Sequence, residues 1–80
     1  MVARVNVLYF ASLRDAAGVA SETVDLDGDL RTLYIALRER HGFVLPIERL
    51  RVAVDGTFAR WDDVVRDGSE VAFIPPVSGG

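Results

Sequence analysis

The sequence has 80 residues, half of them hydrophobic and 26% charged, which is ordinary for one folded domain and unlike the polar composition of disordered chains. Twelve acidic residues against nine basic ones give a net charge of −3, and because the basic residues are scattered we expect no nucleic-acid partner. The absence of cysteine excludes disulfides, thiolate metal sites and a cysteine nucleophile.

The first predicted element is a strand at residues 2–10, where β-branched and aromatic residues follow a period of two. One face of this strand carries Val5 and Val7, and the other carries Leu8 and Phe10. Its outer face is therefore mixed rather than uniformly polar.

Two short elements follow. Residues 11–18 lose the period of two, gain alanine and end in glycine, which predicts a short helix with a glycine C-cap. Residues 20–26 alternate weakly and stop at Asp27-Gly28, a turn signal, which predicts a second strand at the edge of a sheet.

The main helix is predicted to begin after Asp29, a residue type that caps helix N-termini. It ends near Gly42, with basic residues in the last turn that complement the helix dipole. Because His41 has no second ligand at a suitable spacing, we expect it at a solvated helix end and predict no metal site. The apolar stripe that marks the helix consists of Leu30, Leu33, Tyr34 and Leu37.

Three strands complete the chain. Residues 50–54 alternate up to the hairpin signal Asp55-Gly56, which leads into a short strand at residues 57–59. Residues 70–74 form the last strand, which Pro75-Pro76 must stop because proline has no amide donor.

This order of elements predicts an α+β fold of the ubiquitin-like β-grasp type. A mixed sheet of about five strands would carry one main helix on one face, with the first and last strands parallel and central. Trp61 is expected to pack under the loop that precedes the last strand. The residues predicted to face the helix are Val5, Val7, Val52, Val54, Val71 and Phe73.

The C-terminal segment has its own chemistry. We divide the chain into a domain at residues 1–74 and a flexible tail at residues 75–80, where two prolines are followed by Val77, Ser78 and two glycines. The prolines favour an extended tail that reaches roughly 15 to 20 Å, enough to enter a partner's cleft. Gly79 and Gly80 lack side chains, so a narrow channel could admit them.

The Gly80 carboxylate is the candidate reactive group. It is ionised at neutral pH and a poor electrophile until it is converted to an acyl-adenylate. Nothing in the chain is typical of an ATP site, so activation must come from another protein. Once adenylated, the carbonyl can accept either sulfur or an amine, and the residues alone leave both fates open.

The sequence resembles the small, sulfur-carrying subunit of molybdopterin synthase, the MoaD family, along its whole length. Small departures are Asp55, where relatives commonly have asparagine, and Ser69, where they commonly have aspartate. Three stretches carry the resemblance, the last being the most specific: Tyr9-Phe10-Ala11-Ser12-Leu13-Arg14, Asp67-Gly68-Ser69-Glu70-Val71-Ala72-Phe73 and Pro75-Pro76-Val77-Ser78-Gly79-Gly80.

The resemblance implies a role in molybdenum cofactor biosynthesis. An adenylating enzyme would attach AMP to Gly80 and a sulfurtransferase would convert it to a thiocarboxylate. The large, catalytic subunit of molybdopterin synthase would then receive the tail, in a heterotetramer, and pass the sulfur to a cyclic pyranopterin precursor. The chain itself would be non-catalytic and would hold no bound cofactor beyond these transient modifications.

Strand parity supplies a candidate partner interface. Leu8 and Phe10 should share the face opposite the helix with Ala72 and Ile74. An uncovered apolar patch there would mark a docking surface. Phe58 and Arg14 match family contact positions, so the predicted interface residues are Phe10, Arg14, Phe58 and Ile74. The alternative, that Phe10 and Phe58 are core residues, stays open.

Other functions remain compatible with the sequence. The chain could carry sulfur for thiamine, cysteine or tRNA thiolation, act as a ubiquitin-like protein modifier, or be a non-catalytic scaffold domain. All nine basic residues are arginine, so no side-chain amine is available to accept an isopeptide bond. No signal peptide or membrane span is visible, and we expect a cytoplasmic protein without a membrane partner.

Overall fold

The computed structural model describes residues 2–76, and its elements follow the predicted order. Predicted and observed bounds differ by no more than one residue, and one short 3-10 turn, η1, was not predicted. The elements are β1 (Ala3–Tyr9), α1 (Ser12–Ala17), β2 (Ser21–Leu26), α2 (Leu30–His41), η1 (Ile47–Arg49), β3 (Arg51–Val54), β4 (Thr57–Phe58) and β5 (Glu70–Ile74).

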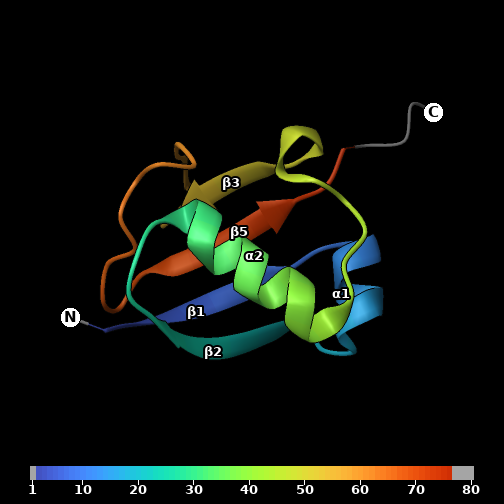
Figure 1. Cartoon of the computed structure of the whole chain (residues 1–80), viewed down its shortest axis with the longest axis horizontal. Helices are drawn as coiled ribbons and strands as arrows, with labels where there is room; N and C mark the ends of the chain where they lie inside the picture. Colours follow the sequence, from blue (N-terminus) through green and yellow to red (C-terminus); the bar gives the residue numbers. More distant parts are fainter. Residues whose placement is uncertain (1, 77–80) are drawn as a thin grey trace.

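The five strands form one mixed sheet in the order β2-β1-β5-β3-β4 (Figure 1). β1 and β5 are parallel neighbours, whereas the other pairs are antiparallel. The first and last strands are therefore both flanked, and β2 lies at an edge. The mixed sheet, its parallel central pair and the edge position of β2 were predicted, and together with α2 they confirm the ubiquitin-like β-grasp fold.

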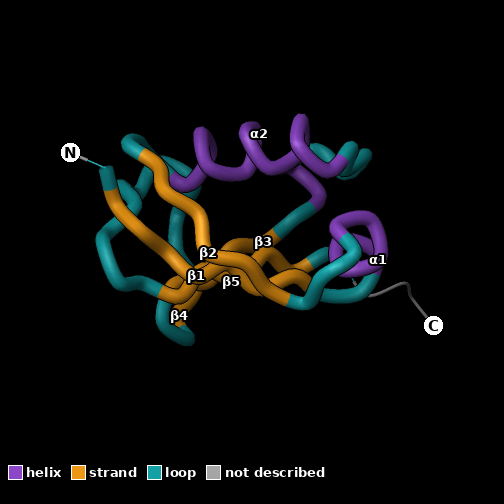
Figure 2. The backbone as a smooth tube through the Cα atoms, turned by 90° about the horizontal axis from the view of Figure 1, so that it is seen from below, coloured by secondary structure: helices purple, strands orange, loops and turns teal. Residues whose placement is uncertain are grey.

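Helix α2 lies across one face of the sheet, while α1 sits near the end of the sheet where the chain leaves β1 (Figures 1 and 2). At the start of α2, Asp29 Oδ1 accepts hydrogen bonds from the Thr32 amide and hydroxyl, both at 2.8 Å. At its end, Gly42 adopts φ +72° and its amide donates to the Arg38 carbonyl at 2.8 Å. Within residues 2–76 no helix covers the opposite face of the sheet.

The core lies between α2 and the sheet. All four residues of the predicted helix stripe are buried, and so are five of the six predicted strand residues, with Val54 partly exposed. The buried Tyr34 hydroxyl donates to the Leu45 carbonyl at 2.6 Å, so its polar group is satisfied. Trp61 stacks on Phe73 with ring centroids 6.0 Å apart, which places it against the core.

Two aspartates tie turns to neighbouring strands. In the hairpin between β3 and β4, Asp55 has φ +51° and Gly56 has φ +86°, as a two-residue turn with two left-handed positions requires. Asp55 Oδ1 accepts from the Glu70 amide at 2.9 Å, which joins this turn to β5. Asp67 Oδ1 accepts from the Arg4 amide at 2.7 Å and joins the last turn to β1.

Candidate functional site

The root of the predicted tail lies at the middle of the sheet. β5 ends at Ile74, which pairs with Arg51 of β3, and Pro75 and Pro76 follow it without strand structure. The predicted stop at the prolines is therefore observed. The remaining tail residues, Val77, Ser78, Gly79 and Gly80, lie outside the described residues, so their role and the division at residue 75 remain predictions.

An apolar hollow lies on the sheet face opposite α2, beside the root of the tail. We use the name apolar hollow for its lining residues, which come from β1 and the residue after it, from β5, from β3 and from the β3–β4 hairpin: Leu8, Phe10, Ala53, Gly56, Phe58, Glu70, Ala72 and Ile74. Strand parity predicted that Leu8, Phe10, Ala72 and Ile74 share this face, and Leu8 indeed pairs with Ala72 across β1 and β5. Three of the four predicted interface residues, Phe10, Phe58 and Ile74, line it.

The exposure of the two phenylalanines shows whether they are core residues or surface residues that could form an interface. Phe10 is 45% exposed and Phe58 is 68% exposed, so neither is a core residue. Large apolar side chains gathered on one uncovered face are typical of a surface that another protein covers. Their part in an interface remains a prediction, but their geometry now suits it.

Charged residues border the apolar hollow. The Arg51 guanidinium lies 5.9 Å from the centre of the Phe58 ring, and Glu70 lines the hollow from β5. Arg51 and Ile74 also line a second groove that includes Arg49, Pro75 and Pro76 at the root of the tail. An apolar centre with a polar rim is the usual anatomy of a binding surface.

The fourth predicted interface residue, Arg14, is placed differently. It is exposed on α1 and does not line the apolar hollow. It follows Phe10 through Ala11, whose φ of +51° and ψ of −123° turn the chain sharply into α1. The structure therefore brings Phe10, Phe58 and Ile74 together and leaves Arg14 on a neighbouring element.

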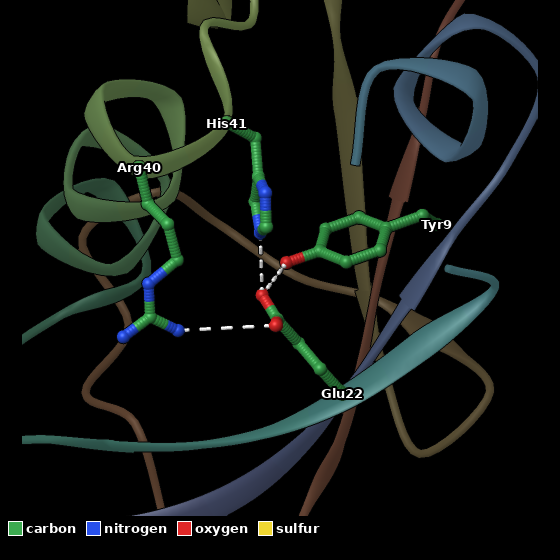
Figure 3. Close-up of polar contacts among 4 residues, drawn as sticks. All are labelled: Tyr9, Glu22, Arg40 and His41. Atoms are coloured by element: carbon green, nitrogen blue, oxygen red, sulfur yellow. Dashed lines mark hydrogen bonds and ion pairs between the residues drawn. The ribbon is translucent and has the colours of Figure 1, made fainter. Parts of the chain in front are cut away.

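The expectation of a solvated His41 was wrong. The His41 side chain is 13% exposed, and its Nε2 lies 2.7 Å from Glu22 Oε1 of β2 (Figure 3). The Tyr9 hydroxyl donates to the same oxygen at 2.5 Å, and Arg40 Nη1 lies 3.8 Å from Glu22 Oε2. Sequence reasoning missed this cluster because its members are far apart in the chain.

The cluster keeps Glu22 ionised although it is partly buried. Burial alone raises the pKa of Glu22, but hydrogen bonds from His41 and Tyr9, with the charges of His41 and Arg40, outweigh it and hold this pKa below its usual range. Burial and the hydrogen bond to Glu22 raise the pKa of Tyr9, which keeps the phenol protonated as a donor.

Two further observations concern residues 2–76. No group of three or more histidine, aspartate or glutamate side chains in this part of the chain is arranged to hold a metal ion. Neither of its helices combines the length and apolar character needed to cross a membrane.

Comparison with known proteins decides the family. A model of the ThiS family matches residues 7–80. The chain belongs to the ThiS family. This ThiS-family chain is 36% identical to the molybdopterin synthase sulfur carrier subunit of Escherichia coli (strain K12), over 95% of this chain and 99% of that protein. The resemblance drawn from the three sequence stretches is thereby confirmed.

Solved structures support the same family and fold. SAMP1 from Haloferax volcanii matches with a TM-score of 0.81 at 27% identity, covering 96% of this chain and 99% of that one. A putative subunit 1 of the molybdopterin converting factor from Pyrococcus furiosus matches with a TM-score of 0.78 at 29% identity, covering 94% and 99%. The ThiS-family chain thus has the β-grasp fold of ubiquitin-like sulfur carriers along nearly its whole length.

Proposed function

We propose that this protein is the sulfur carrier subunit of a molybdopterin synthase. The observation that carries the proposal is the 36% identity to such a subunit over 99% of its length. The apolar hollow supports it, because a carrier that presents its tail to another subunit needs a docking surface at the root of that tail. Phe58 and Ile74 meet this need, since they line the hollow next to Pro75.

The proposed chemistry takes place at the Gly80 carboxylate. A carboxylate oxygen attacks the α-phosphorus of ATP on an adenylating enzyme, and pyrophosphate leaves. A sulfide-level nucleophile supplied by a sulfurtransferase then attacks the acyl carbon, and AMP leaves to give the thiocarboxylate. This protein supplies the acyl group and the docking surface and is itself non-catalytic.

The partner in the synthase is the large, catalytic subunit, which receives the tail and passes the sulfur to a cyclic pyranopterin precursor. The dithiolene of the product needs two sulfur atoms, so the carrier must leave and be recharged. Reversible docking suits the apolar hollow, which occupies part of one face of a small domain and has charged residues at its border.

Deleting Gly80 tests the chemistry. The protein is incubated with the adenylating enzyme, ATP and sulfide, and intact mass spectrometry detects replacement of one oxygen by sulfur. We expect the deletion variant to unfold like the wild type but to gain no sulfur. Val44→Ala, an exposed change on the loop after α2, serves as a control that is charged normally. A folded deletion variant that still gains sulfur would overturn the proposal.

A second candidate function is protein modification, favoured by the match to SAMP1, a small archaeal modifier protein. In that case the activated Gly80 carbonyl would form amides with lysines of other proteins. Because this chain has no lysine, it cannot build side-chain-linked polymers of itself, and only its N-terminal amine could accept another copy. Covalent adducts to other proteins in intact mass spectra would favour the modifier, and co-purification with the large synthase subunit would favour the carrier.

A further inference from the structure

The cluster around Glu22 lies on the α2 side of the sheet, the face opposite the apolar hollow. Glu22 pairs with Val7 in the register of β1 and β2, so its side chain shares a face with Tyr9, two residues further along. His41 is the last residue of α2, and its ring meets the Tyr9 ring edge-on at 5.6 Å (Figure 3). One carboxylate therefore joins β1, β2 and the end of α2.

The cluster fixes the last residue of β1 from several sides. Tyr9 is 2% exposed, its amide donates to the Ala20 carbonyl at 2.9 Å, and its hydroxyl donates to Glu22. Its ring also contacts the Phe43 ring edge-on, with centroids 5.5 Å apart. The next residue is Phe10, whose side chain is on the opposite face and lines the apolar hollow.

The turn after Phe10 is strained. Ala11 has φ +51° and ψ −123°, a combination that glycine adopts freely and that residues with a Cβ adopt at an energetic cost. Such a conformation persists where its surroundings hold it on both sides. On one side stands Tyr9 with its cluster, and on the other stands Leu13, which is 2% exposed and donates its amide to the Phe10 carbonyl at 3.1 Å.

We propose that Tyr9, Glu22 and His41 are positioning residues that hold the strained Ala11 turn and thereby fix Phe10 and Arg14 for the docking partner. This inference rests on the proposed function for the identity of the partner. Tyr9 and His41 both bind Glu22 Oε1, so a variant that removes one of these contacts still keeps the other. Because the cluster lies on the α2 side of the sheet and the hollow on the other side, it would act on a partner at the hollow through the turn and not by direct contact.

Two tyrosine variants separate positioning from general stability. Tyr9→Phe removes the hydroxyl that donates to Glu22, and Tyr34→Phe removes a hydroxyl of α2 that donates to the Leu45 carbonyl in the loop after that helix. Both delete one hydrogen bond made by a buried tyrosine, and Tyr9→Phe should lower the melting temperature at least as much, because its acceptor is an ionised carboxylate. We expect Tyr9→Phe to weaken binding of the large synthase subunit about three- to tenfold in calorimetric titration, and Tyr34→Phe to change it less than about twofold.

A rescue variant tests the role of strain. In an Ala11→Gly background the turn is no longer strained, because glycine has no Cβ. Adding Tyr9→Phe to that background should then weaken binding of the large subunit less than about twofold. A role in stability alone would give the same loss in both backgrounds. The inference is overturned if Tyr9→Phe binds like the wild type, or if its loss is undiminished in the Ala11→Gly background.

A readout without any partner keeps this inference separate from the proposed function. In ¹⁵N NMR spectra of the free protein, the amide resonances of Phe10 and Arg14 should shift in Tyr9→Phe and stay in place in Tyr34→Phe. If the wild type does not bind the large subunit but these resonances shift as expected, the proposed function fails and the positioning role stands. If they do not shift, the positioning role fails whatever the partner.

Discussion

Phe58→Ala is the most direct test of the apolar hollow as a docking surface. The side chain is 68% exposed, which for a phenylalanine of about 200 Å² leaves about 130 Å² for a partner to cover. At about 25 cal/mol per Å², covering that area contributes about 3 kcal/mol. After allowance for the methyl group that alanine keeps, we expect a loss of about 2 to 3 kcal/mol in binding, or roughly 30- to 150-fold in Kd.

The same variant should leave the fold almost unchanged. Phe58 lies on the two-residue strand β4 at the edge of the sheet, where its ring lies beside the guanidinium of the exposed Arg51. We therefore expect the free energy of unfolding to fall by less than about 1 kcal/mol. Calorimetric titration with the large subunit measures the first quantity, and chemical denaturation measures the second.

A matched control is Val44→Ala, because Val44 is 84% exposed but lies on the loop after α2, away from the hollow. It should change neither Kd nor stability measurably. A Kd for Phe58→Ala within about twofold of the wild type would refute the docking surface. So would a loss of stability larger than the loss of affinity, since Phe58 would then act in packing.

Three further predictions concern the stability of the fold. Tyr34→Phe should lower the free energy of unfolding by about 1 kcal/mol, because the Leu45 carbonyl loses a buried partner, and thermal circular dichroism should show a melting temperature about 4 to 8 °C lower. Gly42→Ala should cost about 1 kcal/mol in chemical denaturation, because φ is +72° while no atom within 4 Å would obstruct a Cβ; an unchanged midpoint would contradict the strained cap. Glu22→Gln should lower the free energy of unfolding at neutral pH, and the difference from the wild type should shrink as the pH falls below about 4.5. The pKa of Glu22 is lower in the folded than in the unfolded protein, so the ionised carboxylate stabilises the fold at a pH above its unfolded-state pKa. That stabilisation is lost as the pH falls through the folded-state pKa. A gap that stays constant in denaturation curves from pH 7 to pH 3 would contradict the ionised cluster.

The elements could be predicted because their signals are local. The cap at Asp29 and the glycine at position 42 mark the ends of α2 by chemistry that acts within one turn. The pair Asp55-Gly56 marks the hairpin because both residues tolerate positive φ. Strand parity then placed Phe10 and Ile74 on one face, since successive residues of a strand point to opposite faces and Val7 and Phe73 face the helix. Phe58 was added to this face from the family resemblance, and its pairing with Ala53 places it there.

The Glu22 cluster could not be predicted, for a physical reason. Tyr9, Glu22 and His41 lie 13 and 19 positions apart, and no periodic pattern links them. Read alone, a glutamate on an edge strand and a histidine at a helix end are typical solvated residues. Their contact depends on the position of α2 over the sheet, which no local pattern gives. The turn η1 was missed for a related reason, because three residues are too few to show a helical period.

One face of the sheet stays uncovered because the described part of the chain has one long helix to pack against it. One helix of twelve residues can cover one face of a five-stranded sheet, and within residues 2–76 no second helix covers the other. Exposed positions on β1 and β5 would normally be polar, as Arg4 and Glu70 are, so the apolar Leu8, Ala72 and Ile74 at the tail end of these strands stand out against that pattern.

This contrast explains how a small domain can be both stable and a transient partner. The α2 face supplies the core, and its buried residues do not depend on any other protein. The open face holds its apolar residues near the root of the tail, so under the proposed function docking there would also bring Gly80 to the partner. Glu22 belongs to the first face and Phe10 to the second, so in the proposed positioning role the adjacent residues Tyr9 and Phe10 link the two faces just before the strained turn at Ala11.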